Sequence, residues 1–308
     1  YGPSEASLGS DDVLDAALTH MVAELRALRR APELGPYSGP ALLAPRAAGV
    51  FFHEVLGHRL EAQRQRGEDE GQTFREQLGK PVLPEALTVI DDPTLKEVNG
   101  VALNGHYGFD DEGVAAQRVV LVDNGVLRSF LMGRRPAPGF HASNGHGRAS
   151  GLHPPTARMA NLVVSAAVVK PRKALIDALI EQARAQGKPY GLIISDLAGG
   201  STNTSSAGYQ AFKGAARLVY KVDAQTGAQT LVRGVDLVGT PLSSLRRIVA
   251  AGDRLGVFNG YCGAESGMVP VSTVAPAILF SEIELQRATR GRARPPLLPP
   301  PARVTPRP

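Results

Sequence analysis

The segment RVVLVDNGVLRSFL, residues 118–131, has the pattern of two short strands joined by a tight turn. Apolar and β-branched side chains alternate on both sides of Asn124 and Gly125, and these two residues readily adopt the positive φ angles of a two-residue hairpin turn. Residues 217–239 repeat the pattern with a longer turn near Gly227. Hairpins of this kind join antiparallel strands, so we expect a sheet in which antiparallel pairing predominates.

Helical patterns flank these strands. The first begins at Ser10, a good N-cap residue, and carries an apolar stripe with a period close to four residues, which predicts an amphipathic helix. Further helices are expected over residues 45–67, 171–187 and 241–253. The sequence therefore predicts an α+β fold, with a mostly antiparallel β-sheet core and a few flanking helices.

Composition divides the chain into three parts. We predict an N-terminal amphipathic helix and linker over residues 1–36, a folded domain over 37–287, and a basic, proline-rich, disordered tail over 288–308. The chain begins with Tyr1 rather than methionine, which indicates a cut or processed product that lacks its original N-terminus and any targeting signal.

The charge distribution argues against nucleic acid as a specific partner. The net charge is +5, but six arginines and no acid occur from Arg287 onward, which leaves 28 basic and 29 acidic residues in the rest of the chain. No apolar run approaches the roughly 20 residues that a membrane-spanning helix needs. Cys262 is the single cysteine, which excludes an internal disulfide and fits a reducing compartment. An exported protein without disulfides would fit too, but the expected location is cytoplasmic.

The segment FFHEVLGH, residues 51–58, supplies the residue types of a zinc hydrolase. Neutral imidazole is a good zinc ligand, and a nearby glutamate can act as general base. His53 and His58 are five residues apart, however, which is about 140° around an ideal helix at roughly 100° per residue. A π-helical turn, or a distortion at Gly57, would bring the two rings together. The alternative is that both histidines are ordinary residues of a helix.

A third ligand type lies far away in the sequence, in NGYCGAESG, where we expect a polar turn after a helix. As a thiolate, Cys262 would complete a set of His53, His58 and cysteine and would leave a fourth position open, as in catalytic zinc sites. Glu61, three residues after His58, could orient that histidine, although a solvated carboxylate is the simpler interpretation.

Other polar segments are weaker candidates. The acidic turn GFDDEG, residues 108–113, could bind a hard cation or could be only solvated. Residues 142–151 and 197–208 read as flexible polar loops that offer backbone amides to a ligand. Further potential metal ligands are His146 and His153.

Several of these motifs together resemble the TldD/PmbA family of metallopeptidases. The similar segments occur in the same order as in that family and span roughly residues 37–287. They are HEVLGHRLE from 53, GFDDEG from 108, the hairpin with VDNGVL, RMAN at 158–161, GLIISDLAGG from 191, and the glycine-flanked cysteine followed by MVPVSTVAPAILFSEIEL.

The resemblance implies that residues 37–287 are a metallopeptidase C-terminal domain. It implies a Zn²⁺ site made by His53, His58 and Cys262, and a metal-activated water with Glu54 as general base. It also implies unfolded or extended peptides as substrate.

Residues expected to line the substrate cleft are Gly199, Gly200 and Ser201. Members of the family carry a further N-terminal domain and form dimers, so a homodimer or a heterodimer with a related subunit is expected.

Two other interpretations stay open at this point. The chain could be a non-catalytic partner or scaffold subunit, in which a fourth protein ligand such as His146 or Glu61 completes a structural metal site. It could also associate with nucleic acid through its basic tail, as the family's historical link to DNA gyrase suggests.

Overall fold

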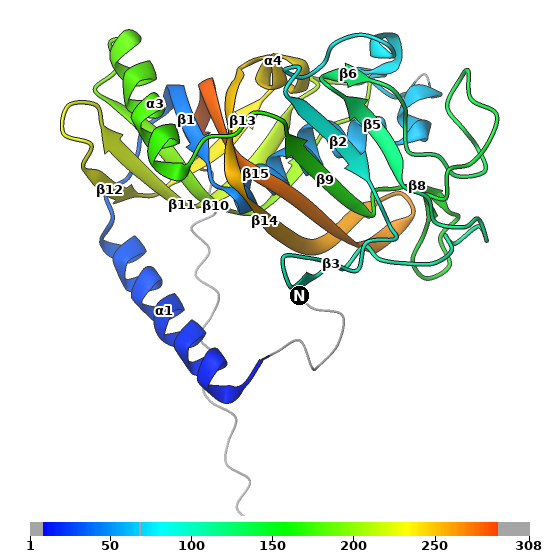
Figure 1. The fold of residues 1–308 in the computed structure, drawn as a ribbon, viewed down its shortest axis with the longest axis horizontal. Coiled ribbons are helices and arrows are strands. Elements are labelled where there is room, and N and C mark those ends of the chain that lie inside the picture. Colours follow the sequence, from blue (N-terminus) through cyan, green and yellow to red (C-terminus); the bar gives the residue numbers. More distant parts are fainter. Residues whose placement is uncertain (1–8, 68, 289–308) are drawn as a thin grey trace, which may run out of the picture.

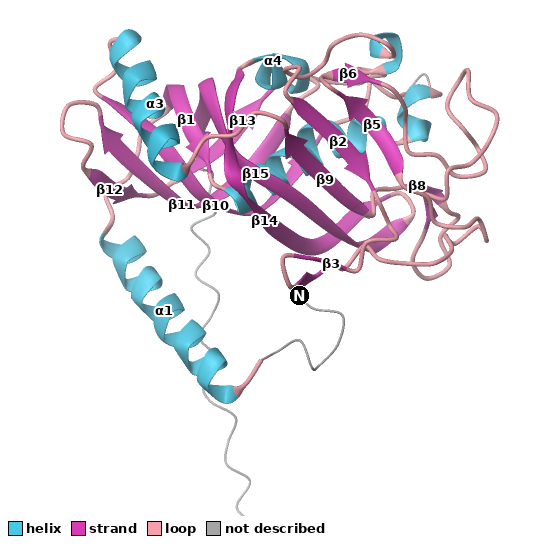
Figure 2. Ribbon diagram, viewed as in Figure 1, coloured by secondary structure: helices cyan, strands magenta, loops and turns pink. Residues whose placement is uncertain are grey.

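The structure, a computed structural model, describes residues 9–67 and 69–288. One sheet of eleven strands dominates it, with two small two-stranded sheets beside it (Figures 1 and 2). In chain order the strands of the main sheet are β1 (Tyr37–Leu43), β2 (Leu87–Asp91), β5 (Val119–Asp123), β6 (Val126–Leu127), β9 (Asn161–Ala166), β10 (Tyr190–Thr202), β11 (Phe212–Asp223), β12 (Gln229–Val232), β13 (Val235–Gly239), β14 (Ile248–Ala264) and β15 (Gly267–Arg287). The small sheets pair β3 (Glu97–Val98) with β4 (Val101–Ala102), and β7 (Gly147–Arg148) with β8 (Thr156–Ala157).

Helices are few. They are α1 (Asp11–Arg30), α2 (Pro45–Phe52), α3 (Arg172–Ala185) and α4 (Pro241–Arg246), a π-helix η2 (His53–Gly57), and the short 3-10 helices η3 (His58–Leu60), η4 (Ala62–Gln65) and η5 (Arg75–Gln77). None of the helices in the described ranges is both long enough and apolar enough to cross a membrane.

The mixed α+β character is as predicted, but the sheet is mixed and not purely antiparallel. The path β1-β10-β11-β13-β15 closes into a ring because β15 also pairs with β1. β1 runs antiparallel to β15 and parallel to β10, and β15 in turn runs parallel to β9. The sequence signals were hairpins, which report only pairs of strands adjacent in sequence, so the two long-range parallel pairs could not be read from them.

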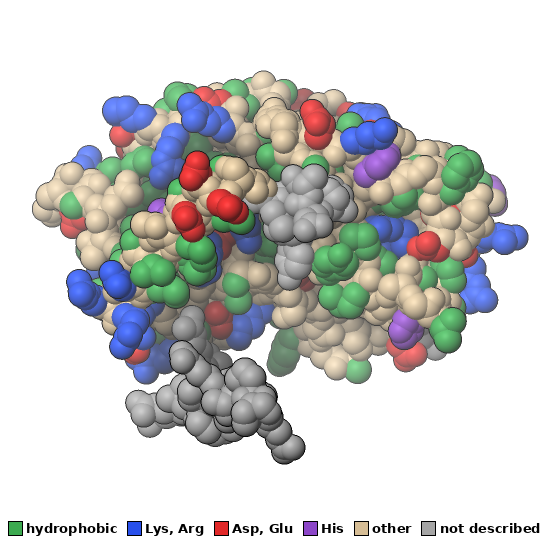
Figure 3. All heavy atoms as spheres, turned by 90° about the horizontal axis from the view of Figure 1, so that it is seen from below, with side chains coloured by type: hydrophobic (Ala, Val, Ile, Leu, Met, Phe, Trp, Pro, Cys, Tyr) green, Lys and Arg blue, Asp and Glu red, His purple; other side chains and the backbone are tan. Residues whose placement is uncertain are grey.

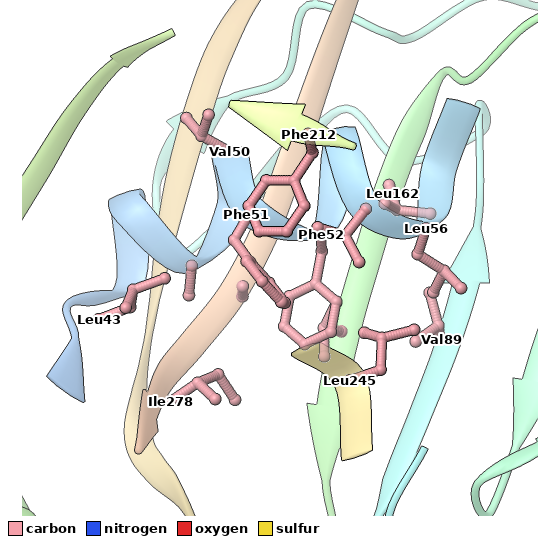
Figure 4. Close-up of a cluster of buried hydrophobic side chains, with 14 of the residues drawn as sticks. Leu43, Val50, Phe51, Phe52, Leu56, Val89, Leu162, Phe212, Leu245 and Ile278 are labelled. Carbon is pink, nitrogen blue, oxygen red and sulfur yellow. The ribbon is translucent and has the colours of Figure 1, made fainter. Parts of the chain in front are cut away.

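The ring carries apolar side chains on both faces. Successive residues of a strand point to opposite sides, so Leu42 packs against α3 while Leu43 joins the main core with α2. Phe51 and Phe52 of α2 lie at the centre of that core (Figure 4). The ring of Phe51 meets Phe280 of β15 edge-on, with centroids 4.9 Å apart. This packing fixes α2, and with it the start of the histidine motif, against the sheet.

The two predicted hairpins are present. Asn124 and Gly125 join β5 and β6 with φ angles of 45° and 79°, as a type I′ turn requires. Gly227, with a φ of 72°, lies in the turn between β11 and β12. The helix expected over residues 171–187 is α3.

Four expected elements differ. The helix expected over 45–67 changes to a π-helix at His53 and then to 3-10 turns. The helix expected over 241–253 ends at Arg246, because Ile248 begins β14 and pairs with Phe280, and this long-range pairing overrides the local helical pattern. Cys262 therefore lies on a strand, opposite Val269, and not in a polar turn.

The supposed loop over residues 197–208 is strand as far as Thr202, because this part of β10 pairs with β11. Helix α1 forms as predicted, but none of its described side chains is buried, and it extends away from the sheet (Figure 1). The tail predicted over residues 288–308 lies outside the described residues from 289 onward.

Candidate metal centre

A π-helix solves the spacing problem of the two histidines. The backbone N–H of His58 donates to the carbonyl oxygen of His53, five residues earlier, so the two residues lie over one another on the same side of the turn. Their rings are 4.9 Å apart between centroids and nearly perpendicular, at 89°. Of the two distortions considered from the sequence, the π-helical turn is the one that occurs.

Gly57 makes this turn possible by close approach. A Cβ on Gly57 would lie 1.9 Å from Sδ of Met159, which is fully buried. The backbone of Gly57 has ordinary helical φ and ψ angles, so its role here is to leave space for Met159 and not to adopt a left-handed conformation.

Cys262, on strand β14, lies next to the two histidines. Its Sγ lies 3.3 Å from Nε2 of His58, and one ligand atom from each of His53, His58 and Cys262 lies within 4.8 Å of the others. Zinc binds sulfur at about 2.3 Å and nitrogen at about 2.0–2.1 Å, so two ligand atoms of a tetrahedral site are about 3.5 Å apart. The separation and the donor types fit one zinc ion.

The electrostatics of the three groups also suit a cation. Burial alone would raise the pKa of Cys262, but the neighbouring His53 and His58 lower it well below its usual value, so a thiolate is favoured. Nδ1 of His53 is buried and has no hydrogen-bond partner among the described residues. A buried nitrogen without a hydrogen-bond partner destabilises the folded protein. A cation bound at this nitrogen would give it a partner and offset that destabilisation.

Glu61 lies behind His58 and orients it. Its carboxylate is fully buried, and Oε1 lies 3.3 Å from Nδ1 of His58. Burial would raise the pKa of Glu61, but His58, Arg158 and Arg64 lower it, so the group is a carboxylate. A carboxylate on the remote nitrogen of a histidine fixes the ring and increases its basicity as a ligand.

Arg158 connects the two halves of the site. It is fully buried, its Nε lies 3.4 Å from Oε1 of Glu61, and its guanidinium donates to the carbonyl oxygen of Cys262 at 2.6 Å. It also donates to Ser266 Oγ at 2.9 Å in the turn between β14 and β15. One side chain thus holds both the carboxylate behind His58 and the strand that carries the cysteine.

Glu54 points to the same place from the π-helix. It is 6% exposed, and burial raises its pKa despite the opposing effect of His53 and His58. Gly200 of β10 lies against it, since a Cβ there would be 2.5 Å from Cγ of Glu54. The strand can pass this close to the carboxylate only because residue 200 has no side chain.

Two cavities meet at Glu54. One of about 320 Å³ is lined by His53, His58 and Cys262, and a second of about 420 Å³ extends towards Arg46. Gly200, Glu54, His53 and Tyr261 line both. Their volumes are in the range of small-ligand sites.

The structure therefore brings together the predicted site residues His53, Glu54, His58, Cys262, Gly200 and Ser201. Of the cleft residues, Gly199 lines only the cavity on the Arg46 side, and Ser201 lines only the one beside Cys262.

The weaker candidates have other roles. Asp110 is buried and accepts hydrogen bonds from three backbone N–H groups, so the acidic turn holds its own loop together. Nε2 of His146 lies 3.2 Å from Asp91, and its Nδ1 lies 3.0 Å from the Asn144 carbonyl oxygen. His153 is exposed. In the described ranges, His53, His58 and Cys262 are the single cluster with metal-ligand geometry.

Sequence reasoning missed Arg158, Asp91 and Met159. All three are buried within the protein, and each acts through a residue far away in sequence. Asp91, for example, accepts hydrogen bonds from the backbone N–H groups of Ala160 and Asn161. The one signal was that Arg158, Met159, Ala160 and Asn161 form the RMAN motif, which the family resemblance already included.

Known proteins share this domain. The PmbA/TldA metallopeptidase C-terminal domain matches residues 36–287. A metalloprotease of Archaeoglobus fulgidus is 35% identical over 263 residues, which cover 84% of this chain and 55% of that protein. A zinc metalloprotease TldD homolog of Saccharolobus solfataricus is 25% identical, over 82% of this chain and 52% of that protein. The chain thus spans about half the length of these relatives.

Solved structures show the same fold. TldE from Thermococcus kodakarensis superposes with a TM-score of 0.62 at 15% identity, over 88% of this chain and 55% of that one. A putative modulator of a DNA gyrase from Thermotoga maritima gives 0.59 at 20% identity, over 84% and 52%. With the matched domain and the relatives above, these likenesses lead to one conclusion: the chain belongs to the TldD/PmbA family of metallopeptidases, and residues 36–287 correspond to its C-terminal domain.

Proposed function

We propose that this chain is the zinc-binding part of a peptidase that hydrolyses unfolded or extended peptides. The observation that carries the proposal is the convergence of His53, His58 and Cys262 on one point, with the buried carboxylate of Glu54 beside it where two cavities meet. Three protein ligands leave one position open, which is the arrangement of catalytic zinc and not of structural zinc.

His53, His58 and Cys262 would hold the ion. When bound, zinc polarises a carbonyl oxygen and makes a water molecule acidic near neutral pH. Glu61 and Arg158 keep the ligand geometry, because they fix His58 and the backbone of Cys262 respectively.

Glu54 is the proposed general base. Burial raises its pKa, which makes the carboxylate a stronger base than an exposed glutamate. It takes a proton from the water that attacks the peptide carbonyl, and it returns a proton to the amine as the peptide bond breaks. The backbone of Gly200 packs against the side chain of Glu54.

Two strand edges support an extended substrate. β1 pairs with β10 only at residues 192–194, so the β10 edge on that side has no partner strand beside Glu54 in the described part of the chain. β14 pairs with β15 on one side, and in the described ranges its other side makes only an isolated bridge, from Gly252 to Lys170, at the end away from the site. A peptide lying between Gly199–Ser201 and residues 259–263 could bond to backbone groups, which favours extended chains and low sequence selectivity.

Replacement of Glu54 tests the mechanism. The Glu54→Gln protein should bind as much zinc as the wild type, because the residue is not a ligand, but should lose about 10²–10⁴-fold in kcat for peptide hydrolysis. Glu181→Gln, at an exposed position on α3, is the matched control and should leave kcat unchanged. Full peptidase activity in Glu54→Gln would refute the role given to this carboxylate.

We further propose that the active form is a dimer with a second TldD/PmbA-like subunit. A solved relative with this fold is a TldE protein, and the chain spans only about half the length of its relatives.

The non-catalytic alternative needs a fourth protein ligand on the metal, and cobalt substitution distinguishes such a closed site from an open, catalytic one. Exogenous thiol or hydroxamate should change the visible spectrum of an open site, and a closed four-ligand site would leave it unchanged.

A further inference from the structure

A third cavity lies next to the candidate metal centre and has a different chemistry. It has a volume of about 460 Å³ and shares Glu265 with the cavity that contains His58 and Cys262. Glu265 pairs with Arg64 at 2.8 Å, and this ion pair forms part of the partition between the two spaces. A ligand group in the third cavity would thus be close to a peptide held at Glu54.

Three arginines line this cavity: Arg66, Arg134 and Arg135. Within the described ranges, none of them has a carboxylate within 4.0 Å of its side-chain nitrogens, whereas Arg64 and Arg158 are both paired with Glu61. Partial burial and the neighbouring Arg135 lower the pKa of Arg66, so the two guanidinium groups repel one another. Like charges gathered around one cavity without partners favour an anion there.

The two acids of the lining do not neutralise them. Oε2 of Glu112 accepts a hydrogen bond from the backbone N–H of Arg134 at 2.5 Å and packs against Gly133. Glu265 is occupied by Arg64 on the partition. The charge of Glu112 opposes the lowering of the Arg66 pKa, but Glu112 forms no ion pair with Arg66, and one carboxylate without an arginine partner against three arginines leaves the cavity net positive.

The remaining walls combine polar side chains, Gln63 and Thr156, with two prolines and small residues. Pro154 and Pro155 lead into β8, whose Ala157 is buried and accepts a hydrogen bond from the Gln63 side chain through its carbonyl oxygen. Prolines restrict the backbone, so the cavity does not need to be ordered on binding. Its shape can therefore select a ligand before the arginines engage it.

We infer that this arginine cavity binds a carboxylate group of the peptide substrate. A guanidinium matches the two oxygens of a carboxylate in a planar, bidentate fashion, and it is the preferred group for this recognition. The carboxylate can be the C-terminus of the peptide or an acidic side chain near the cleaved bond. This inference rests on the proposed function, to which it adds a preference for acidic peptides.

Peptide binding tests the inference apart from catalysis. Peptides of one extended sequence are prepared with Glu or Gln at a single position, scanned along the chain, and with a free or amidated C-terminus. Binding to the Glu54→Gln protein is measured by fluorescence anisotropy. The protein is then compared with versions that also carry Arg66→Gln with Arg135→Gln, or Arg172→Gln as the matched control. Arg172 is exposed on α3, at the other end of the molecule from β8 (Figure 1).

At least one carboxylate should tighten binding by about tenfold over its amide, the size expected of a charged hydrogen bond. The double arginine variant should abolish this preference, and Arg172→Gln should keep it. Loss on C-terminal amidation identifies the terminus as the ligand, and loss on one Glu→Gln change identifies a side chain. Equal binding of acids and amides, or a preference that survives in the double variant, would overturn the inference.

Two further results distinguish a failure of this inference from a failure of the proposed peptidase function. Hydrolysis by the wild type with no preference for acidic peptides would leave the peptidase standing and remove the subsite. Acid-selective, arginine-dependent binding without any hydrolysis would remove the peptidase and keep the subsite as a binding site. If a single-stranded oligonucleotide, and not the acidic peptides, needs Arg66 and Arg135 for binding, the ligand is a nucleic acid and the inference is wrong.

Discussion

Gly57 shows how one missing side chain sets the geometry of the centre. In Gly57→Ala the new methyl would overlap Sδ of Met159, so either the π-helical turn or Met159 must move. We expect a loss of about 1–3 kcal/mol in the free energy of unfolding, the usual range for overpacking, together with weaker zinc binding. Chemical denaturation and a zinc competition assay measure the two effects.

Met159, which packs against Gly57, offers an internal control for that experiment. Adding Met159→Ala to Gly57→Ala removes the overlapping atoms, so the double variant should regain zinc affinity even though Met159→Ala alone leaves a cavity. Gly35→Ala is a neutral comparison, because no atom lies within 4 Å of the added Cβ. If Gly57→Ala binds zinc as the wild type does, close packing at Gly57 is not what holds the two histidines together.

Protons and zinc compete for His58. Burial lowers the pKa of this imidazole, but Glu61 and Cys262 raise it well above the usual value, so the metal-free protein keeps His58 protonated at neutral pH. Cys262 is already a thiolate there, because its pKa is lowered. Zinc must displace the imidazolium proton, so zinc affinity should rise with pH by up to about tenfold per unit until the pKa of His58 is passed.

A chelator competition between about pH 6 and about pH 8 measures this dependence. Glu61→Gln removes the carboxylate that holds the proton on His58, so its affinity should stop rising at a lower pH than in the wild type. A zinc affinity that does not change over this interval would show that His58 is neutral in the metal-free protein.

Among the elements, α2 packs directly on β14, with Gly49 against Phe258 and Pro45 against Gly256, and the metal ligands join the π-helical extension of α2 to the same strand. A bound ion joins them directly, so its removal should loosen these two elements more than the rest of the sheet. We expect chelation to lower Tm and to speed amide hydrogen exchange in residues 53–65 and 259–264. Exchange in α3 is the internal control, because that helix packs on the other face of the sheet.

Exchange that accelerates equally in α3 and β14 would mean that the metal stabilises the domain as a whole. No change in either Tm or exchange would mean that the site is already fixed by protein contacts such as those of Arg158. Arg158→Met tests whether protein contacts alone fix the site. Breaking its buried ion pair should lower the free energy of unfolding by about 3–5 kcal/mol whether or not zinc is present.

Local sequence signals predicted elements where neighbours along the chain decide the structure. The Asn124-Gly125 turn, α3 and the existence of α1 were all predicted correctly. The end of α4 was not, because Ile248 belongs to a strand whose partner lies about thirty residues later. The same limit applies to the site: His53, Glu54 and His58 form one local motif, whereas the contact of Arg158 with Glu61 joins segments that no spacing rule relates.

On the scale of the whole molecule, acidic and basic residues are balanced before Arg287, and we expect the folded domain to be independent of α1. Acidic and basic side chains are interspersed on the face shown in Figure 3, and apolar side chains reach the surface at several points. Helix α1 contributes to such exposure, since Leu18 and Leu25 are each 53% exposed. The strands of the main sheet begin at Tyr37 and end at Arg287, so the core is complete without α1.

Deletion of residues 1–30 tests this independence. Because no described side chain of α1 is buried, its removal should change Tm by no more than a few degrees and should leave zinc content unchanged. It should also reduce aggregation, since the exposed apolar stripe is lost. Deletion to residue 43 is the contrasting control, because it removes β1, whose Ala41, Leu42 and Leu43 are buried between β10 and β15, and should abolish folding. Unfolding of the shorter deletion would show that α1 supports the sheet through contacts other than burial of its own side chains.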